Sequence, residues 1–343
     1  MKQIVCLILA TLTILSLCAC GGETQQETQP QQQMQQQPET QPQEPTLSPY
    51  IMQKEDPKGD DSLNVLFVSN STCVYFPDEL VGVLTAAGYK DVTLCGVYYN
   101  AASIKQHYEW LQGRETKYRF DINTPEGRTS IQDYDLTAAL AYRNWDVISF
   151  DNNSASFGSG NVDIALSNAE PYFGQLLEYI QTQYPLSRYF WHEMWANEVG
   201  YSLTYQMTSV AQRTQIYNTQ KEVAKTLAQR YSLEIVPTGA AWEKVRDNSI
   251  ITTPIDGIPL DRFTLCTRVY NGELRDDFVH DGDMGGGQYL NACVWFEIIT
   301  GQSCVGNTFR PKYEYAGIDC SLSEEKIALL QNAAHEAVAE LKK

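Results

Sequence analysis

The chain has 343 residues, with 42 Asp and Glu against 25 Lys and Arg, and a formal net charge of −17. This balance excludes nucleic acid as a partner, because neutralising phosphates needs clustered cations and the sequence supplies no basic face. Hydrophobic residues make up 43% and aromatic residues 11% of the chain, which is enough for a sizeable core. Only four residues are histidine, so each histidine is a distinctive candidate for chemistry.

The N-terminal segment has the pattern of a bacterial export signal. Lys2 precedes an apolar run over residues 4–17, which is too short for a good membrane-spanning helix. The run ends in L-C-A-C at Cys20, which resembles the lipobox of bacterial lipoproteins. The resemblance implies that residues 1–19 are removed, that the sulfur of Cys20 carries a diacylglyceryl group, and that the protein is anchored to the outer face of the cell membrane. An ordinary signal peptide that ends near a cysteine is the alternative.

Residues 20–50 have the composition of a tether. Between Gly21 and Pro49 lie eleven Gln, five Pro and four Glu, without Lys or Arg. Such a segment cannot bury apolar surface, so we expect it to be disordered and to hold a folded domain clear of the membrane.

From residue 63 onward, short apolar runs alternate with segments of helical periodicity. This alternation predicts a mostly parallel sheet covered by helices on both faces. Strands are expected over 64–68, 91–97, 145–150, 188–191 and 233–236, and helices over 77–87, 169–183, 207–231, 240–246 and 287–300. The spacing of Ile327, Leu330, Ala334 and Val338 predicts a C-terminal amphipathic helix within 321–343, packed on the domain and capped by Ser321 with Glu324.

Six cysteines follow Cys20, and none of them forms a C-x-x-C pair. We therefore expect no zinc site, no other metal and no cofactor. Most of the thiols are expected to be small buried groups, and a pair such as Cys304 with Cys320 stays open.

A serine, a histidine and an aspartate are candidates for nucleophilic catalysis. Ser71 follows the first predicted strand, and the carboxyl edge of an open α/β sheet is where ligands bind. Asp277 and His280 form a D-x-x-H pattern, whose spacing lets the carboxylate orient the imidazole as a general base. The alternative is an acidic surface loop, since Asp276 and Asp281 crowd the same stretch.

Five sequence blocks in a fixed order resemble the SGNH/GDSL hydrolase superfamily, in particular a largely uncharacterised bacterial lipoprotein branch of it. The blocks are L-F-V-S-N-S at 66–71, W-D-V-I-S-F-D-N-N-S at 145–154, H-E-M-W-A at 192–196, V-P-T-G-A-A at 236–241, and D-x-x-H from Asp277 followed by a glycine-rich helix start. The resemblance covers residues 63–312. It implies a flavodoxin-like three-layer α/β/α fold, with a central, mostly parallel five-stranded sheet, and ester hydrolysis.

The resemblance also implies roles for single residues. Ser71 would be the nucleophile, His280 the base and Asp277 its orienting partner. The oxyanion would be bound by the backbone N–H of Ser71 and of Ala101 and by the side chain of Asn152. Further candidates for substrate binding are Asn70, His107, His192 and Trp195, with His192 either lining the cleft or serving the structure.

Four positions depart from the motifs. Ser69 and Ala101 stand where glycine is usual, and an alanine adopts a positive φ only at a cost. Asp151 and Asn152 replace a pair of glutamines, and a carboxylate at Asp151 would oppose an oxyanion unless it points away. We expect a cell-surface esterase acting on an acylated carbohydrate or another extracellular ester. The alternative is a surface protein with a degraded site that binds glycans without turnover.

Overall fold

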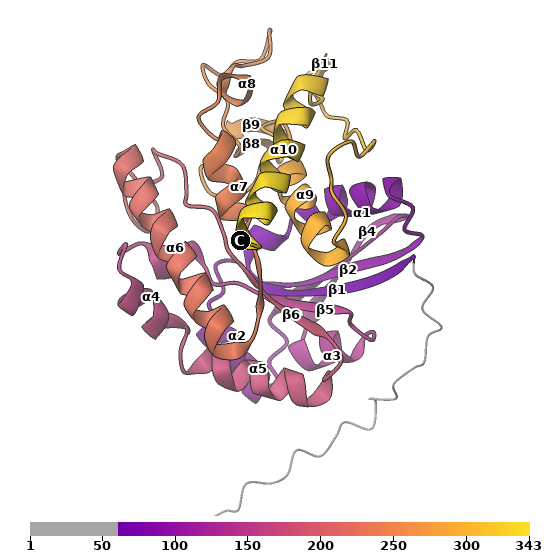
Figure 1. Ribbon diagram of the computed structural model, residues 1–343, viewed down its shortest axis with the longest axis vertical. Helices are drawn as coiled ribbons and strands as arrows, with labels where there is room; N and C mark the ends of the chain where they lie inside the picture. The colour runs from indigo at the N-terminus through magenta and orange to yellow at the C-terminus, as the bar shows by residue number, and fades with distance from the viewer. Residues whose placement is uncertain (1–60) are drawn as a thin grey trace, which may run out of the picture. The chain divides into compact units, whose positions relative to one another are not determined.

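A seven-stranded sheet forms the centre of the computed structural model, which describes residues 61–343 (Figure 1). The predicted signal segment, Cys20 and the tether lie outside the described residues. The strand order is β4-β3-β2-β1-β5-β6-β7. The strands are β1 (Ser62–Ser69), β2 (Asp91–Tyr98), β3 (Tyr118–Thr124), β4 (Gly127–Tyr134), β5 (Val147–Phe150), β6 (Arg188–His192) and β7 (Glu234–Val236).

Five of these strands run parallel and match the five predicted ones. β1 lies between β2 and β5, and β6 and β7 continue the sheet. The predicted fold class, a three-layer α/β/α arrangement with a mostly parallel sheet, is confirmed. The strand count was wrong, because an antiparallel hairpin of β3 and β4 extends the sheet beyond β2. In β3, which is largely buried, apolar residues alternate with polar ones, and β4 is almost wholly exposed, so the hairpin forms no continuous apolar run.

Helices cover both faces of the sheet (Figure 1). Along β1, Val65 and Phe67 point into one core and Leu66 and Val68 into the other, as the pleat of a strand requires. The helices on the first face are α1 (Phe76–Ala86), α7 (Thr238–Val245), α8 (Ser249–Thr252), α9 (Gly287–Thr300) and α10 (Glu324–Leu341). Those on the second face are α2 (Ile104–Gly113), α3 (Leu136–Ala141), α4 (Val162–Ala169), α5 (Tyr172–Gln183) and α6 (Val210–Tyr231).

The C-terminal helix α10 packs on α9 and α7 with the apolar stripe predicted from its spacing. Its predicted cap was wrong by two residues. Ser323 caps the helix by accepting a hydrogen bond from the backbone N–H of Lys326, whereas Ser321 accepts one from Tyr313 and Glu324 pairs with Arg310.

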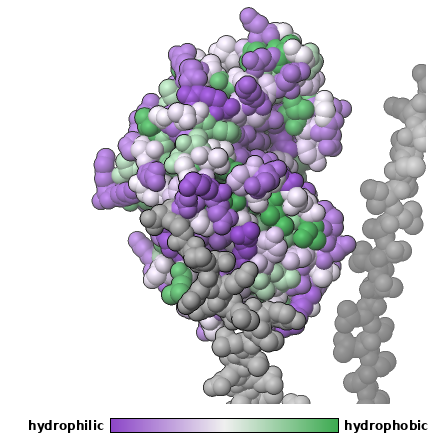
Figure 2. Space-filling model, turned by 90° about the vertical axis from the view of Figure 1, so that its right-hand side faces the viewer, coloured by the Kyte–Doolittle hydropathy of each residue, from purple (hydrophilic) through white to green (hydrophobic). Residues whose placement is uncertain are grey.

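The six cysteines of the described part are free, buried thiols. Cys304 and Cys320 each donate to a backbone carbonyl, of Gln331 and Ile318 respectively, and do not pair with one another. The face of the domain drawn in Figure 2 is mainly hydrophilic, with small separate apolar patches. Among residues 61–343, no helix combines the length and the apolar character needed to cross a bilayer.

Short elements complete the fold around the carboxyl edge of the sheet. They are the 3-10 turns η1 (Ser71–Cys73) and η2 (Ser154–Phe157), and the small hairpins β8 (Thr267–Tyr270) with β9 (Glu273–Asp276) and β10 (Glu314–Tyr315) with β11 (Ile318–Asp319).

Candidate active site

Ser71 lies in a tight turn at the carboxyl end of β1. Asn70 caps this turn, and its Oδ1 accepts a hydrogen bond of 3.3 Å from the backbone N–H of Thr72. The residue Ser71 is 8% exposed. The turn therefore holds a largely buried serine at the edge of the sheet where ligands bind in open α/β folds.

The carboxylate of Asp151, directly after β5, accepts hydrogen bonds from the residues of this turn. Its Oδ2 accepts hydrogen bonds of 2.7 Å from the hydroxyls of Ser69 and Thr72, and its Oδ1 accepts one of 3.0 Å from Nδ2 of Asn70. These donors lie on both sides of Ser71 in the chain. Because both oxygens accept hydrogen bonds from the turn, the carboxylate positions Ser71.

Asp277 and His280 are joined as the D-x-x-H spacing predicts. Asp277 follows strand β9, and its Oδ1 accepts hydrogen bonds from Nδ1 of His280 at 2.5 Å and from the backbone N–H of the same residue at 3.2 Å. The neighbouring Asp276 instead accepts from the hydroxyl of Thr264 and from the backbone of Phe278. Asp277, not Asp276, is therefore the carboxylate that orients this imidazole.

The electrostatics of Asp277 favour its ionised form. Burial by itself would raise the pKa of Asp277, but the hydrogen bonds from His280 and the charges of His280 and Arg268 outweigh it and hold that pKa well below its usual range. Arg275 also pairs with the carboxylate, at 2.8 Å. An ionised carboxylate fixes the imidazole with its proton on Nδ1 and leaves Nε2 as the basic atom.

His280 lies beside the segment that carries Ser71. Its ring meets the ring of Tyr75, four residues after Ser71, edge to face at 5.5 Å between centroids. Nε2 of His280 is buried and has no hydrogen-bond partner, so no hydrogen bond joins it to Ser71. Catalytic hydrogen bonds are often open in unliganded enzymes and tighten with substrate.

The two residues predicted to bind an oxyanion lie on neighbouring loops. Ala101 adopts a left-handed conformation with φ 54°, and Nδ2 of Asn153 holds it there by donating to its carbonyl at 2.8 Å. Asn152 accepts backbone hydrogen bonds from Ile104 and Asn153 through Oδ1, while its Nδ2 is buried without a partner. An N–H group left free in this way is a donor available to a ligand.

Three of the remaining predicted site residues lie in the interior. His107 bonds Tyr118 through Nδ1 at 2.8 Å, and burial lowers the pKa of His107 to about 4, so it is neutral. His192 is 1% exposed, and its Nε2 lies 2.8 Å from the hydroxyl of Thr238. Trp195 is fully buried, stacks on Trp242 at 4.4 Å and donates from Nε1 to the carbonyl of Val279 at 2.7 Å. Trp195 thus fixes the segment between Asp277 and His280.

Comparison with known proteins places the chain in a family. The family model DUF4886, a domain of unknown function, matches residues 69–337. The chain belongs to the DUF4886 family. A DUF4886 protein from Bacteroides uniformis is 22% identical, covers 82% of this chain and 97% of its own, and has a TM-score of 0.62, a likeness that shows the fold.

Other similar structures are more distant. A lipase/acylhydrolase from Enterococcus faecalis is 8% identical over 70% of this chain and 96% of its own, with a TM-score of 0.44. An acetylxylan esterase from Geobacillus stearothermophilus is 13% identical over 71% of this chain and 95% of its own, with a TM-score of 0.43. The curated proteins contain no match.

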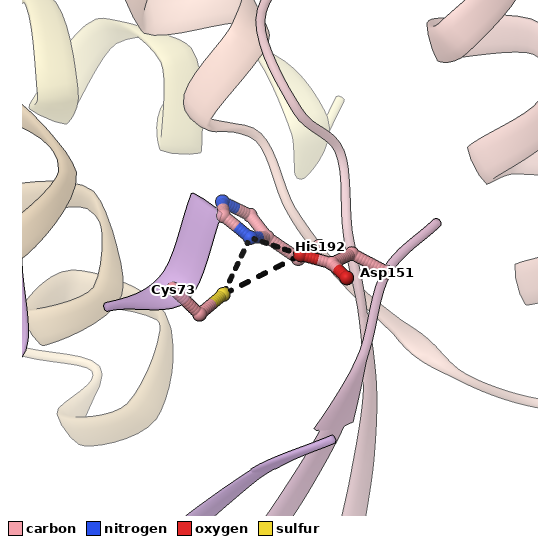
Figure 3. Close-up of side chains that lie close together, drawn as sticks. All are labelled: Cys73, Asp151 and His192. Atoms are coloured by element: carbon pink, nitrogen blue, oxygen red, sulfur yellow. Dashed lines mark hydrogen bonds and ion pairs between the residues drawn. The ribbon is translucent and has the colours of Figure 1, made fainter. Parts of the chain in front are cut away.

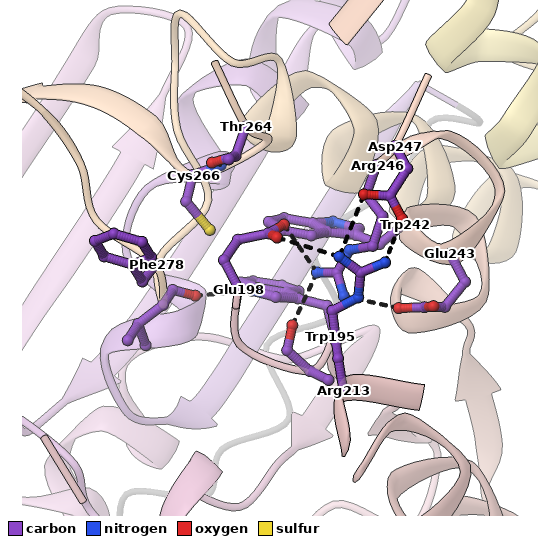
Figure 4. Close-up of polar contacts among 12 residues, drawn as sticks. Trp195, Glu198, Arg213, Trp242, Glu243, Arg246, Asp247, Thr264, Cys266 and Phe278 are labelled. Carbon is purple, nitrogen blue, oxygen red and sulfur yellow. Dashed lines mark hydrogen bonds and ion pairs between the residues drawn. The ribbon is translucent and has the colours of Figure 1, made fainter. Parts of the chain in front are cut away.

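The loop after β6 supports the D-x-x-H segment of this DUF4886 domain in a way that the sequence blocks did not indicate. The backbone N–H of Glu198 donates to the carbonyl of Phe278 at 2.7 Å. The buried carboxylate of Glu198 lies against Arg213 at 3.5 Å and Arg246 at 3.3 Å (Figure 4). Arg213 is held in turn by Asp247. Phe278 has φ 64°, a conformation that is costly for a side chain of this size, so the surroundings must impose it.

Tyr75 and Arg268 are further site residues that sequence reasoning missed. The guanidinium of Arg268 lies 3.8 Å from the ring centroid of Tyr75 and 4.9 Å from that of Tyr270. Its Nε is 3.9 Å from the carboxylate of Asp277. No motif marks these residues, because the contacts join the end of β1 to the β8–β9 hairpin across almost two hundred positions.

Proposed function

We propose that this DUF4886 protein is a cell-surface serine ester hydrolase. The observation that carries the proposal is the Asp277–His280 hydrogen bond of 2.5 Å, which leaves Nε2 of His280 free beside the segment that carries Ser71. An aspartate, a histidine and a serine in this relation are the parts of an acyl-transfer site.

The reaction follows the chemistry of these groups. The Ser71 hydroxyl attacks the ester carbonyl while Nε2 of His280 takes its proton, and Asp277 stabilises the imidazolium that forms. The oxyanion is bound by the free Nδ2 of Asn152 and by backbone N–H groups, including that of Ala101. His280 then returns the proton to the leaving alcohol. A water molecule, deprotonated by His280, then attacks the acyl-enzyme, and His280 returns the proton to the Ser71 oxygen as the acid is released.

The substrate we propose is an acylated carbohydrate or another extracellular ester. Support comes from two aromatic side chains, Tyr75 against His280 and the 40% exposed Tyr270 against Arg268, since such rings offer apolar faces with a polar tip. We also propose that Cys20 carries the lipid that holds the protein at the membrane. Metabolic labelling with a fatty acid tests this step, and incorporation that persists in Cys20→Ala would contradict it.

Labelling with a fluorophosphonate probe tests the catalytic step in the full-length protein. We expect covalent labelling and hydrolysis of short-chain p-nitrophenyl esters in the wild type, and loss of both in Ser71→Ala. Ser62→Ala is the matched control, because Ser62 begins strand β1, at the end opposite to the Ser71 turn, and should leave both activities intact. Absence of labelling and turnover in the folded wild type, with glycan binding retained, would favour the binding protein instead.

A further inference from the structure

A second cluster of reactive side chains lies next to the Ser71 turn. The proposed hydrolysis uses one of them, Asp151, to position the turn, and assigns no role to the cluster as a whole. Cys73, Asp151 and His192 come from the turn after β1 and from the ends of β5 and β6 (Figure 3). All three are buried, and each offers one potential metal ligand. Sγ of Cys73 lies 3.3 Å from Nδ1 of His192 and 3.5 Å from Oδ2 of Asp151, and these last two atoms are 3.7 Å apart.

The three distances fit one metal ion. A triangle with these sides has a point roughly 2.0 Å from all three atoms, close to the zinc bond lengths of about 2.0–2.2 Å for nitrogen and oxygen. A displacement of the ion by roughly 0.3 Å within the plane of the triangle, away from the sulfur, lengthens the bond to sulfur to its normal value of about 2.3 Å and leaves the bonds to nitrogen and oxygen at roughly 1.9 Å. The side chains therefore need little movement to become ligands.

The hydrogen bonds around His192 prepare its Nδ1 as a ligand. Thr238 donates its single hydroxyl proton to the carbonyl of Glu193 at 2.7 Å. The 2.8 Å contact between Thr238 Oγ1 and His192 Nε2 must then be donated by the ring, so Nε2 carries the proton and the lone pair of Nδ1 faces Cys73 and Asp151. A ligating histidine usually donates its other ring N–H in this way.

Asp151 has the partners of a ligating carboxylate. Its oxygens accept hydrogen bonds from Ser69, Asn70 and Thr72. A carboxylate that binds a metal is usually oriented by hydrogen bonds of this kind. Among residues 61–343, no lysine or arginine forms an ion pair with this buried carboxylate, and the nearest basic side chain is that of His192, whose Nδ1 lies 3.7 Å from Oδ2. A cation at the centre of the cluster would supply the missing positive charge.

We propose that Cys73, Asp151 and His192 bind one zinc ion. Zinc replaces the proton of the Cys73 thiol, which is released to solvent, so that Zn²⁺, one thiolate and one carboxylate sum to a neutral buried unit. The ion joins the ends of β1, β5 and β6 beneath the nucleophile turn. The sequence predicted no metal, because these ligands lie 78 and 41 positions apart and follow no zinc spacing.

Metal content tests the site independently of any activity. Full-length protein produced with added zinc and freed of loosely bound metal is analysed by mass spectrometry for zinc per chain. We expect about one zinc in the wild type and in Cys95→Ser, and a loss of most of it in Cys73→Ser. Cys95 is the matched control, since it is an equally buried free thiol on β2 outside the cluster.

A cobalt-substituted sample gives a second readout. We expect absorption from sulfur-to-cobalt charge transfer in the wild type and in Cys95→Ser, and its absence in Cys73→Ser. His192→Gln, which removes a different ligand, decides the question if Cys73→Ser does not fold. The proposal is overturned if the folded wild type retains no zinc, or if the Cys73 and His192 variants retain as much as Cys95→Ser.

Discussion

The hydroxyl of Ser69 donates a hydrogen bond of 2.7 Å to Oδ2 of Asp151. The two residues lie 82 positions apart, and both depart from the motifs that the chain otherwise resembles, with Ser69 in place of a glycine and Asp151 in place of a glutamine. Each departure is unfavourable alone, as an added side chain in a tight turn or as a charge near an oxyanion. Together they form a contact that steadies the turn around Ser71, so the two changes compensate each other.

Asp151→Asn is expected to loosen the Ser71 turn. The amide cannot accept all the hydrogen bonds that the carboxylate accepts, and leaving buried donors unsatisfied costs about 1–3 kcal/mol of unfolding free energy. Urea denaturation measures this loss, and we expect a slower rate of fluorophosphonate labelling beside it. Ser69→Gly removes one hydrogen bond and should cost about 1 kcal/mol. Labelling of Asp151→Asn at the wild-type rate would show that this carboxylate does not position Ser71.

Asp277→Asn and Asp276→Asn form a matched pair of adjacent residues. The first removes the charge that fixes the His280 tautomer, so we expect kcat for ester hydrolysis to fall by about 10²–10⁴-fold with little change in KM. The second changes a carboxylate that bonds Thr264 and the backbone of Phe278 and should keep most of the activity. Steady-state kinetics with p-nitrophenyl acetate compares them. Equal losses in the two variants would contradict the assigned role of Asp277.

The elements that the sequence predicted well are those with a strong local signal. The strand predicted from the apolar run at 64–68 is β1, which extends over Ser62–Ser69. The helix predicted over 287–300 is α9, and its bounds in the structure are the same. The β3–β4 hairpin was missed because strand β4 is almost wholly exposed and carries no apolar run. The cap of α10 was misplaced because Ser321 with Glu324 matches the capping box, whereas Ser323, the residue that caps the helix, is followed by Lys326 and does not. Ser321 instead accepts a hydrogen bond from the backbone of Tyr313.

In the candidate site too, the contacts between residues close in sequence could be predicted, and those between distant residues could not. The contact of Asp277 with His280 is local and follows from the D-x-x-H spacing. The contacts of Asp151 with the Ser71 turn depend on β1 and β5 being neighbours in the sheet, which a single sequence does not reveal. His192 was assigned to the cleft or to the structure, and its burial behind the turn is set by packing against Phe76 and Trp295.

Asn152→Ala is expected to impair the transition state more than substrate binding. The unpartnered Nδ2 of Asn152 is available to an oxyanion, and removing one such donor costs about 10²–10³-fold in kcat in comparable sites. Asn168→Ala is the matched control, because its Nδ2 donates to the carbonyl of Ser156 and is not free. Kinetic analysis with the same ester separates kcat from KM. A rise in KM with unchanged kcat would assign Asn152 to ground-state binding instead.

Buried carboxyl groups make stability depend on pH. Burial raises the pKa of Glu79 to about 7, although a hydrogen bond from Tyr313 partly offsets this. An unfolded glutamate titrates near pH 4.3, so between about pH 4.3 and 7 the folded protein holds more protons and the free energy of unfolding falls as pH rises. Glu79→Gln should therefore gain stability relative to the wild type from pH 5 to pH 8, as urea midpoints measure. Glu325→Gln, which makes the same change at an exposed position of α10, is the control for the substitution itself.

Gly200→Ala tests whether the strained backbone at Phe278 depends on space left by a neighbouring glycine. Gly200 has φ +112°, and a Cβ added there would lie 2.8 Å from Cε1 of Phe278, the residue after Asp277. Gly306→Ala is the matched control, because Gly306 has φ +87° but open space around its would-be Cβ. The left-handed conformation alone costs about 1–2 kcal/mol, so Gly306→Ala should lose that much stability and keep its fluorophosphonate labelling.

The effect of Gly200→Ala should be larger and should reach His280. Phe278 has to move to relieve the contact, and its backbone is bonded to Glu198 while the next carbonyl is bonded to Trp195. We expect a greater loss of unfolding free energy than in Gly306→Ala, together with slower labelling of Ser71. Equal losses of unfolding free energy in the two glycine variants, with labelling intact in both, would show that the position of the D-x-x-H segment does not depend on the packing of Phe278.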